Sequence, residues 1–220
     1  MSASPVRLAV FDCDGTLVDG QHDIIAAMDS AFSSLGLTPP PRGATRRIVG
    51  LSLPQAMRRL LPEGEPELIA ALVETYKAAY RLARVEGRLT EPLFEGIPAL
   101  LDALRTDGWD LAVATGKSDR GLHHCLTTHG LLDHFVSLQT ADRHPSKPHP
   151  AMLQAALADA LALPEGSAMI GDTSFDMAMA RAAGVRAIGV AWGYHSPAEL
   201  LAAGADSVAT SPAHLQEILG

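Results

Sequence analysis

The chain has few of the sequence features that are typical of disulfide-bonded, nucleic-acid-binding or membrane proteins. It contains only two cysteines, Cys13 and Cys125, so no disulfide framework is indicated. Its 17 basic residues are outnumbered by 25 acidic ones, which argues against a wide surface for nucleic acid or anionic lipid. No run reaches the roughly 18 apolar residues of a membrane span, and no basic segment with a long apolar run opens the chain. We therefore expect a cytoplasmic protein that binds neither nucleic acid nor a membrane.

Aromatic residues are also scarce, at 5% of the chain, so a core must be built mainly from alanine, leucine, valine and isoleucine. Short apolar runs typical of buried parallel strands cover residues 6–11, 110–114, 167–170, 185–190 and 205–208. Helical patterns lie at residues 97–104, 118–130, 150–161 and 173–183, and a last one begins at residue 211. This alternation predicts an α/β fold with a doubly wound parallel sheet.

One region breaks the alternation. Between Gly20 and about Arg88 the patterning is helical, with helices expected at residues 23–35, 54–61 and 67–84 and a rigid turn at the prolines 39–41. The length of 220 residues suits a core domain with a smaller insert. We therefore expect a small helical insert after the first strand.

Polar residues that could meet follow three of the predicted strands: Asp12 and Asp14, then Thr115, then Asp172 and Asp176. In open α/β sheets ligands bind beyond the carboxyl ends of the strands, so residues far apart in sequence can share one pocket there. Clustered carboxylates repel one another, and a divalent cation offsets that repulsion; carboxylate, carbonyl and water ligands suit Mg²⁺. Lys147, in a proline-rich loop before a helix, and Thr115 would then bind an anion, which suggests a phosphate group.

Those residue types also suit covalent chemistry. A carboxylate beside a bound phosphate can act as the nucleophile. A second carboxylate two residues later can serve first as an acid and then as a base.

The motifs around these residues resemble those of a known family. The segment Asp12–Asp19, DCDGTLVD, resembles the DxDGT signature of the haloacid dehalogenase-like hydrolase superfamily. Thr115 at a strand end, Lys147 in a Lys-Pro-x-Pro loop and the segment Gly171–Asp176 match its later motifs in order. The resemblance implies a Rossmann-like hydrolase core of residues 1–16 and 92–220 and a helical cap of residues 17–91.

The resemblance also implies a role for each site residue. Asp12 would attack phosphorus and form an aspartyl-phosphate, and Asp14 would protonate the leaving alcohol and then activate water. The Asp12 and Asp172 carboxylates and the Asp14 backbone carbonyl would bind Mg²⁺. Two further sets of residues complete the expected site: Asp176, acting on the metal indirectly or through a metal-bound water, and Thr115, the Gly116 amide and Lys147, holding the transferring phosphoryl group.

The substrate expected from the resemblance is a small phosphorylated metabolite. The segments Gly189–Tyr194 and Glu199–Asp206 are similar to phosphoglycolate phosphatases and their close relatives. Gly116 stands where those relatives commonly carry asparagine. In the cap, Arg47 and Gly50 are candidates for substrate specificity, because an arginine there could bind a substrate carboxylate in a bidentate contact. We expect a phosphoric monoester hydrolase that is a monomer or a homodimer.

Other functions stay open at this stage. A sugar phosphomutase or a pyrophosphatase could use the same core, although Leu53 and Ile24 stand where related mutases carry an arginine and a histidine. Asp14 argues against a dehalogenase, and Lys77, the lone cap lysine, lies within a long helix, which argues against a phosphonate hydrolase. The nine histidines fit no standard zinc spacing. Cys13 is expected to serve packing, and the amides of Lys117 and Ser118 to matter more than their side chains.

Overall fold

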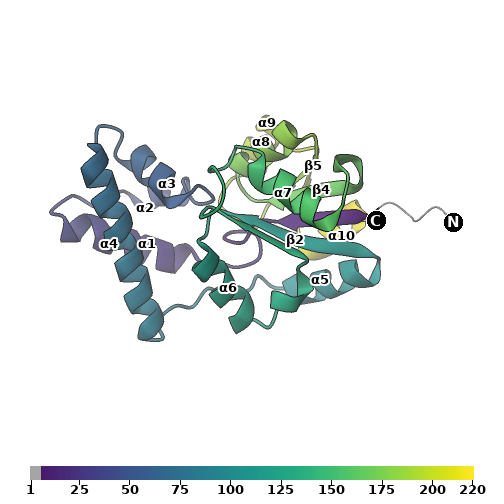
Figure 1. Cartoon of the computed structure of the whole chain (residues 1–220), viewed down its shortest axis with the longest axis horizontal. Helices are drawn as coiled ribbons and strands as arrows, with labels where there is room; N and C mark the ends of the chain where they lie inside the picture. Colours follow the sequence, from purple (N-terminus) through teal and green to yellow (C-terminus); the bar gives the residue numbers. More distant parts are fainter. Residues whose placement is uncertain (1–5) are drawn as a thin grey trace.

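A parallel sheet of six strands organises the chain (Figure 1). The computed structural model describes residues 6–220. The strands are β1 (Arg7–Phe11), β2 (Trp109–Thr115), β3 (Ser137–Thr140), β4 (Ser167–Gly171), β5 (Arg186–Val190) and β6 (Ser207–Ala209). Their order in the sheet is β3-β2-β1-β4-β5-β6, and every neighbouring pair is parallel. The predicted doubly wound α/β fold is therefore confirmed.

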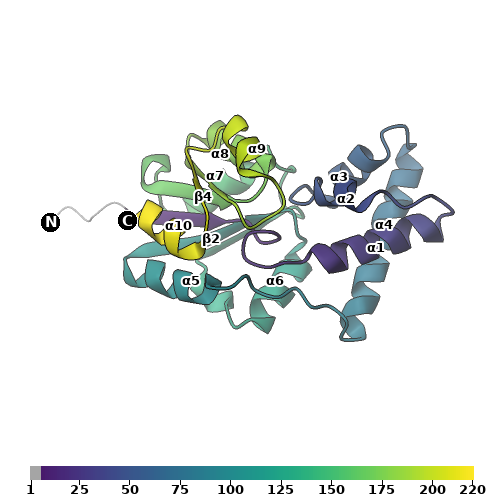
Figure 2. The same ribbon diagram turned by 180° about the vertical axis from the view of Figure 1, so that it is seen from behind.

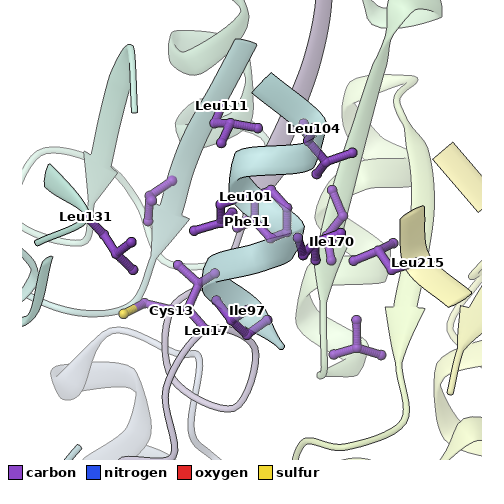
Figure 3. Close-up of a cluster of buried hydrophobic side chains, with 14 of the residues drawn as sticks. Phe11, Cys13, Leu17, Ile97, Leu101, Leu104, Leu111, Leu131, Ile170 and Leu215 are labelled. Atoms are coloured by element: carbon purple, nitrogen blue, oxygen red, sulfur yellow. The ribbon is translucent and has the colours of Figure 1, made fainter. Parts of the chain in front are cut away.

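Helices cover both faces of this sheet. They are α5 (Ile97–Thr106), α6 (Asp119–Thr128), α7 (Ala151–Ala160), α8 (Ser174–Ala183), α9 (Pro197–Ala202) and α10 (Pro212–Leu219). Because successive side chains of a strand point to opposite faces of the sheet, the side chains of β1 belong to two separate hydrophobic cores, one on each face. Phe11 packs with Leu101 of α5 and Leu215 of α10, as Figure 3 shows. Val10, one residue earlier, packs on the other face with residues of α7 and α8.

A second group of helices lies beside the sheet and is built from the segment between β1 and α5 (Figures 1 and 2). We call α1 (Gln21–Ser34), α2 (Arg42–Arg46), α3 (Leu53–Leu60) and α4 (Pro66–Val85) the cap helices. They share a small core of their own, in which Met28, Met57 and Leu72 are almost completely buried.

Two backbone segments join the cap helices to the core, and they are hydrogen-bonded to each other. Val18 and Leu93 form an antiparallel bridge, and the Asp19 amide donates to the Pro92 carbonyl over 2.8 Å. The Phe94 amide likewise donates to the Leu17 carbonyl over 3.0 Å. The two crossings therefore form one short ribbon, which we call the hinge ribbon.

The structure adds elements that the sequence patterns did not predict. Strand β3 has the sequence SLQT, which contains no apolar run. Its polar side chains can be buried because they have a hydrogen-bond partner: Ser137 and Gln139 both donate to Asp159, each over 2.7 Å. The short helices α2 and α9 and two 3-10 turns, Leu132–His134 and Pro164–Gly166, were also not predicted. Among residues 6–220, no helix is both long enough and apolar enough to cross a membrane.

Candidate active site

The polar residues after the central strands converge at one edge of the sheet. Asp12 follows β1, Thr115 ends β2, and Asp172 follows β4. These three strands are neighbours in the sheet, with β1 in the middle, so their carboxyl ends open into the same space. All three side chains are almost completely buried.

Asp12 has one satisfied and one unsatisfied carboxylate oxygen. Its Oδ1 accepts a hydrogen bond from the Cys13 amide over 2.6 Å and lies 3.0 Å from the Lys147 Nζ. Its Oδ2 is buried without any hydrogen-bond partner. Burial raises the pKa of Asp12 to about 7, an effect that Lys147 offsets only in part and that the charge of Asp176 reinforces. A buried oxygen in this state is available to a ligand.

Asp172 is held by two donors from distant parts of the chain. Its Oδ1 accepts from the Thr16 hydroxyl and its Oδ2 from the Tyr194 amide, each over 2.9 Å. Burial, and then repulsion from Asp176 and Asp12, keeps the pKa of Asp172 well above its usual range. The loop after β5 thus has a clear structural role, because it delivers Tyr194 to this carboxylate.

Asp176 lies on the first turn of α8 and links this helix to the lysine. Its Oδ2 accepts from the Thr173 amide and hydroxyl, at 3.0 and 2.6 Å, which caps α8. Its Oδ1 accepts from the Lys147 Nζ over 2.7 Å. Burial alone would lower the pKa of Lys147, but Asp12 and Asp176 raise it above the ordinary value, so the lysine stays charged.

The three carboxylates Asp12, Asp172 and Asp176 meet the requirements of a cation site. One oxygen from each lies within 4.8 Å of the others. All are fully buried, and Lys147 is the cation that pairs with two of them. Burial first, and then repulsion among the carboxylates, raises the pKa values of Asp12 and Asp172, and a bound divalent ion would relieve this penalty on their charged forms. The residues present therefore fit Mg²⁺.

Glycines press directly against the site carboxylates. A Cβ atom on Gly15 or Gly193 would lie 2.2 Å from an atom of Asp172. One on Gly171 would lie 2.4 Å from the Asp176 Cγ, and one on Gly20 would lie 2.6 Å from the Asp14 Oδ1. Real Cβ atoms do not approach other atoms so closely, so each of these positions needs a glycine. The backbone at these glycines therefore packs directly against the site carboxylates.

Asp14 faces the cap helices and belongs to a separate charged network. The Lys117 Nζ lies 3.1 Å from the Asp14 Oδ1 and 2.5 Å from the Glu91 Oε1. The Tyr80 hydroxyl of α4 donates to the same Glu91 oxygen over 2.6 Å. Burial raises the pKa of Asp14, whereas Lys117 holds the pKa of the buried Glu91 below its ordinary value despite that burial.

The side chain of Lys117 was underestimated from the sequence. The sequence predicts that its backbone amide matters more than its side chain, yet that side chain is only 9% exposed and connects Asp14 to the residues beside the cap. The sequence offered one signal, because the chain contains only three lysines and this one follows a predicted strand end. Its partner Glu91 lies in the second crossing from cap to core, which no local pattern reveals.

Thr115 and Gly116 lie where the cap touches the core. The Thr115 Oγ1 accepts from the Lys117 amide over 3.3 Å. A Cβ on Gly116 would lie 2.5 Å from the Leu51 carbonyl oxygen and 2.7 Å from that of Gly50. Gly50 itself has a positive φ of 96°, and a Cβ there would be 3.7 Å from the Asp12 Oδ2. An asparagine at position 116 would not fit under this cap loop.

Arg47 lies away from this group. Its Nη1 pairs with the Glu199 Oε1 over 2.6 Å, and its side chain is 67% exposed. The neighbouring Arg46 donates to the Gly193 carbonyl over 2.9 Å. Both arginines join the cap helices to the core, so the structure gives no support to the expected contact between Arg47 and substrate.

A cavity of about 500 Å³ extends from Asp14 between the cap helices and the core. Thr115, Gly116 and Lys117 line it on the core side. Gly50 lies on its wall, whereas Arg47 does not. The cavity therefore connects the buried charges to the surface.

Comparison with known proteins identifies the group to which this arrangement belongs. The profile of the haloacid dehalogenase-like hydrolases matches residues 9–190. The chain belongs to this family. The match runs from within β1 to the end of β5 and includes Asp12, Asp14, Thr115, Gly116, Lys147, Asp172 and Asp176, so the family resemblance expected from the motifs is confirmed.

Relatives of this haloacid dehalogenase-like hydrolase agree on the enzyme class, with one exception. Probable phosphatase IndB of Dickeya dadantii is 38% identical over 89% of the chain and 86% of its own length. A phosphoglycolate phosphatase of Pseudomonas putida is 32% identical over 86% of the chain and 71% of its own length. The exception, the tyrosine-protein kinase PtkA of Mycobacterium tuberculosis, is 33% identical over 96% of the chain and 71% of its own length. The expected phosphoric monoester hydrolase is confirmed as the class of this enzyme.

Solved structures agree on the fold. A haloacid dehalogenase-like family protein from Streptococcus pneumoniae superposes with a TM-score of 0.85 at 26% identity. The superposition covers 98% of this chain and 99% of that one, so the sheet and the cap helices are both shared.

Proposed function

We propose that the chain is a Mg²⁺-dependent phosphatase that hydrolyses a small phosphate monoester through an aspartyl-phosphate, with phosphoglycolate as the first candidate substrate. The Asp12 Oδ2 carries this proposal, because it is a buried carboxylate oxygen without a partner. It lies on the side chain that also contacts Lys147, in a site where acidic groups need a cation. The name of the Pseudomonas putida relative supports the substrate.

Asp12, Asp172 and the backbone carbonyl of Asp14 are the groups that would hold Mg²⁺, with Asp176 and Lys147 fixing the arrangement. A bound Mg²⁺ neutralises charge on the phosphate and on the carboxylates. The three carboxylates already lie close enough together for this, and the surrounding glycines leave them little room to separate.

The reaction then follows from the positions of two aspartates. The Asp12 Oδ2 attacks phosphorus, the bond from phosphorus to the ester oxygen breaks, and Asp14 gives its proton to the departing alcohol. Burial raises the pKa of Asp14, which favours the protonated form that this step needs. The Asp14 carboxylate next takes a proton from water, the water oxygen attacks phosphorus, and Asp12 is released together with inorganic phosphate. Lys147, charged and pinned between Asp12 and Asp176, stays beside the phosphoryl group throughout.

The experiment is a steady-state screen of phosphate release with and without Mg²⁺. The panel contains phosphoglycolate, pyrophosphate, hexose phosphates and p-nitrophenyl phosphate. We expect Mg²⁺-dependent release from one or more monoesters. Release from pyrophosphate alone, isomerisation of a hexose 1-phosphate, or transfer of phosphate to protein tyrosine would each replace the proposal by another reaction.

The Asp12→Asn variant tests the assigned nucleophile. We expect a loss of at least about 10³-fold in kcat with the fold retained, because the amide keeps the shape but cannot form the phosphoaspartate. Turnover that survives in this variant, with circular dichroism unchanged, would contradict the assignment.

A further inference from the structure

The cavity between cap and core is larger than the phosphate chemistry requires. It measures about 500 Å³, within the range of pockets that hold drug-sized ligands. A glycolate group would leave most of that space unfilled. The residues that line the cavity therefore indicate what kind of alcohol part the substrate has.

Part of the cavity wall is apolar and aromatic. Ile24, Met28 and Val49 line it from the cap side. Tyr76 and Tyr80 of α4 line the same wall and stack on each other, with ring centroids 5.7 Å apart and planes 23° apart. A stacked pair of rings beside aliphatic side chains presents a flat apolar surface, which suits a ring in the ligand.

Three arginines and one acidic residue, Asp142, line the cavity toward its exposed end, where Arg81 and Arg120 are solvent-exposed. Arg81 and Arg84 come from α4 on the cap, and Arg120 comes from α6 on the core. Among the residues that the structure describes, none of these three guanidinium groups has an ion-pair partner. The Nε of Arg84 is also buried without a hydrogen-bond acceptor. A buried guanidinium nitrogen that lacks an acceptor is costly, and an anionic ligand group would supply one.

Asp14 lies at the inner end of this cavity, and the proposed reaction places it beside the leaving oxygen. The alcohol part of the substrate therefore extends from Asp14 along the tyrosines toward the arginines. We propose that the preferred substrates are phosphomonoesters whose alcohol part carries an aromatic ring and, beyond it, a second anionic group held between Arg84 of the cap and Arg120 of the core. This inference rests on the proposed phosphatase function and narrows its substrate class.

The test compares four phosphate esters. Phenyl phosphate carries the ring alone, phosphoglycolate carries an anion without a ring, and 4-carboxyphenyl phosphate and 1,4-phenylene bisphosphate carry both. The variants are Arg84→Gln and Arg120→Gln, with Arg58→Gln as the matched control, since Arg58 is an exposed arginine of α3 that does not line the cavity. Intrinsic leaving-group reactivity is the same in every protein variant, so it cancels when ratios of kcat/KM are compared between variants.

We expect Arg84→Gln and Arg120→Gln each to lower the ratio of kcat/KM for a ring ester with a second anionic group to kcat/KM for phenyl phosphate by about 10-fold or more, as for a lost charge-assisted contact. Arg58→Gln should leave the ratio unchanged. The carboxylate and bisphosphate esters differ in their second anion, so the larger change identifies which anion the arginines hold. Tyr76→Leu should reduce kcat/KM for the ring esters and leave phosphoglycolate unaffected.

Binding provides a readout that does not depend on turnover. Calorimetry with 4-carboxybenzylphosphonate and benzylphosphonate should show tighter binding of the carboxylate, and Arg84→Gln should remove the difference. Equal affinities in the unsubstituted protein, or ratios that both arginine variants leave unchanged, would overturn the inference even if the enzyme hydrolyses phosphate esters. Absence of Mg²⁺-dependent release from every ester, with the binding difference retained, would instead overturn the proposed function alone.

Discussion

The two regions that meet at the active site are built in opposite ways. On the core side, carboxylates are pressed against glycine backbone and two of them pair with a buried lysine, so they have little room to move. On the cap side, a cavity of about 500 Å³ is bounded by tyrosines and arginines on helices, several of them unpaired. The buried carboxylates are therefore held by backbone contacts, whereas the cavity is shaped by side chains that could vary without disturbing those carboxylates.

The largest effect should come from breaking the crowded side. Gly193→Ala places a Cβ within 2.2 Å of Asp172. Displacing this carboxylate by even about 1 Å should lower kcat about 100-fold and weaken Mg²⁺ binding, with a stability loss of about 1–3 kcal/mol from overpacking. Phosphate release and Mg²⁺ calorimetry measure both effects.

The matched control for that substitution is Gly43→Ala in the cap helix α2. A Cβ at this position would meet no atom within 4 Å. The variant should keep full activity and be more stable by about 0.5–1 kcal/mol, because alanine favours the helix. Equal losses in the two variants would show that the crowding around Asp172 has no special importance.

The next effect concerns Lys117, which lies where the two regions touch. Lys117→Met leaves the buried Asp14 and Glu91 carboxylates without their shared cation. We expect a loss of about 3–5 kcal/mol in the free energy of unfolding, measured by urea denaturation, as for other buried pairs broken on one side.

The conservative variant Lys117→Arg keeps the charge and should recover most of that stability. It should also separate charge from length, because arginine carries the same charge on a different shape. If Lys117→Met unfolds at the same urea concentration as the unsubstituted protein, the network between Asp14 and the cap is not a source of stability.

A smaller effect is expected from pH and metal together. The pKa of Asp12 is raised to about 7 and that of Asp172 is raised well above its ordinary value, in both cases first by burial. A carboxyl group whose pKa is raised by folding costs stability once the pH exceeds its unfolded value, because the unfolded chain then releases the proton that the folded protein still holds. The metal-free protein should therefore lose stability as pH rises from about 4 through 7.

Mg²⁺ should reverse that loss. Its binding requires the charged carboxylates, so saturating Mg²⁺ should raise the melting temperature by roughly 5 °C or more at pH 8 and by much less at pH 5.5. Differential scanning calorimetry at the two pH values measures this. Equal shifts at both would mean that the buried carboxylates do not compete with protons for the metal.

The smallest effect should come from Arg47→Gln. The Arg47 side chain is 67% exposed and that of its partner Glu199 is 36% exposed, and exposed ion pairs contribute about 0–1 kcal/mol. We expect unchanged kcat and KM and a shift of less than about 1 kcal/mol by urea denaturation. A clear rise in KM would restore Arg47 as a substrate-binding residue and would weaken the contrast between the two regions.

The sequence was sufficient wherever a residue acts next to its own strand end. The positions of Asp12 and Asp172 follow from apolar runs that end in polar residues, because parallel strands bring their ends together. Strand β3 was missed because its buried polar side chains pair with Asp159, a residue of a helix 20 positions away from Gln139. The role of Lys117 and the cavity were missed for a related reason, since both depend on where the cap helices rest, and that is set by contacts between distant segments.

The hinge ribbon has a practical consequence for engineering. The chain leaves the core and returns to it through Val18 and Leu93, which are hydrogen-bonded neighbours. A different helical module could be grafted between these two residues without cutting the sheet or altering the loops that hold Asp12 and Asp172. The same carboxylate site could then be given a new recognition surface by a single in-frame exchange that keeps Gly20 and Glu91, the neighbours of Asp14 and Lys117.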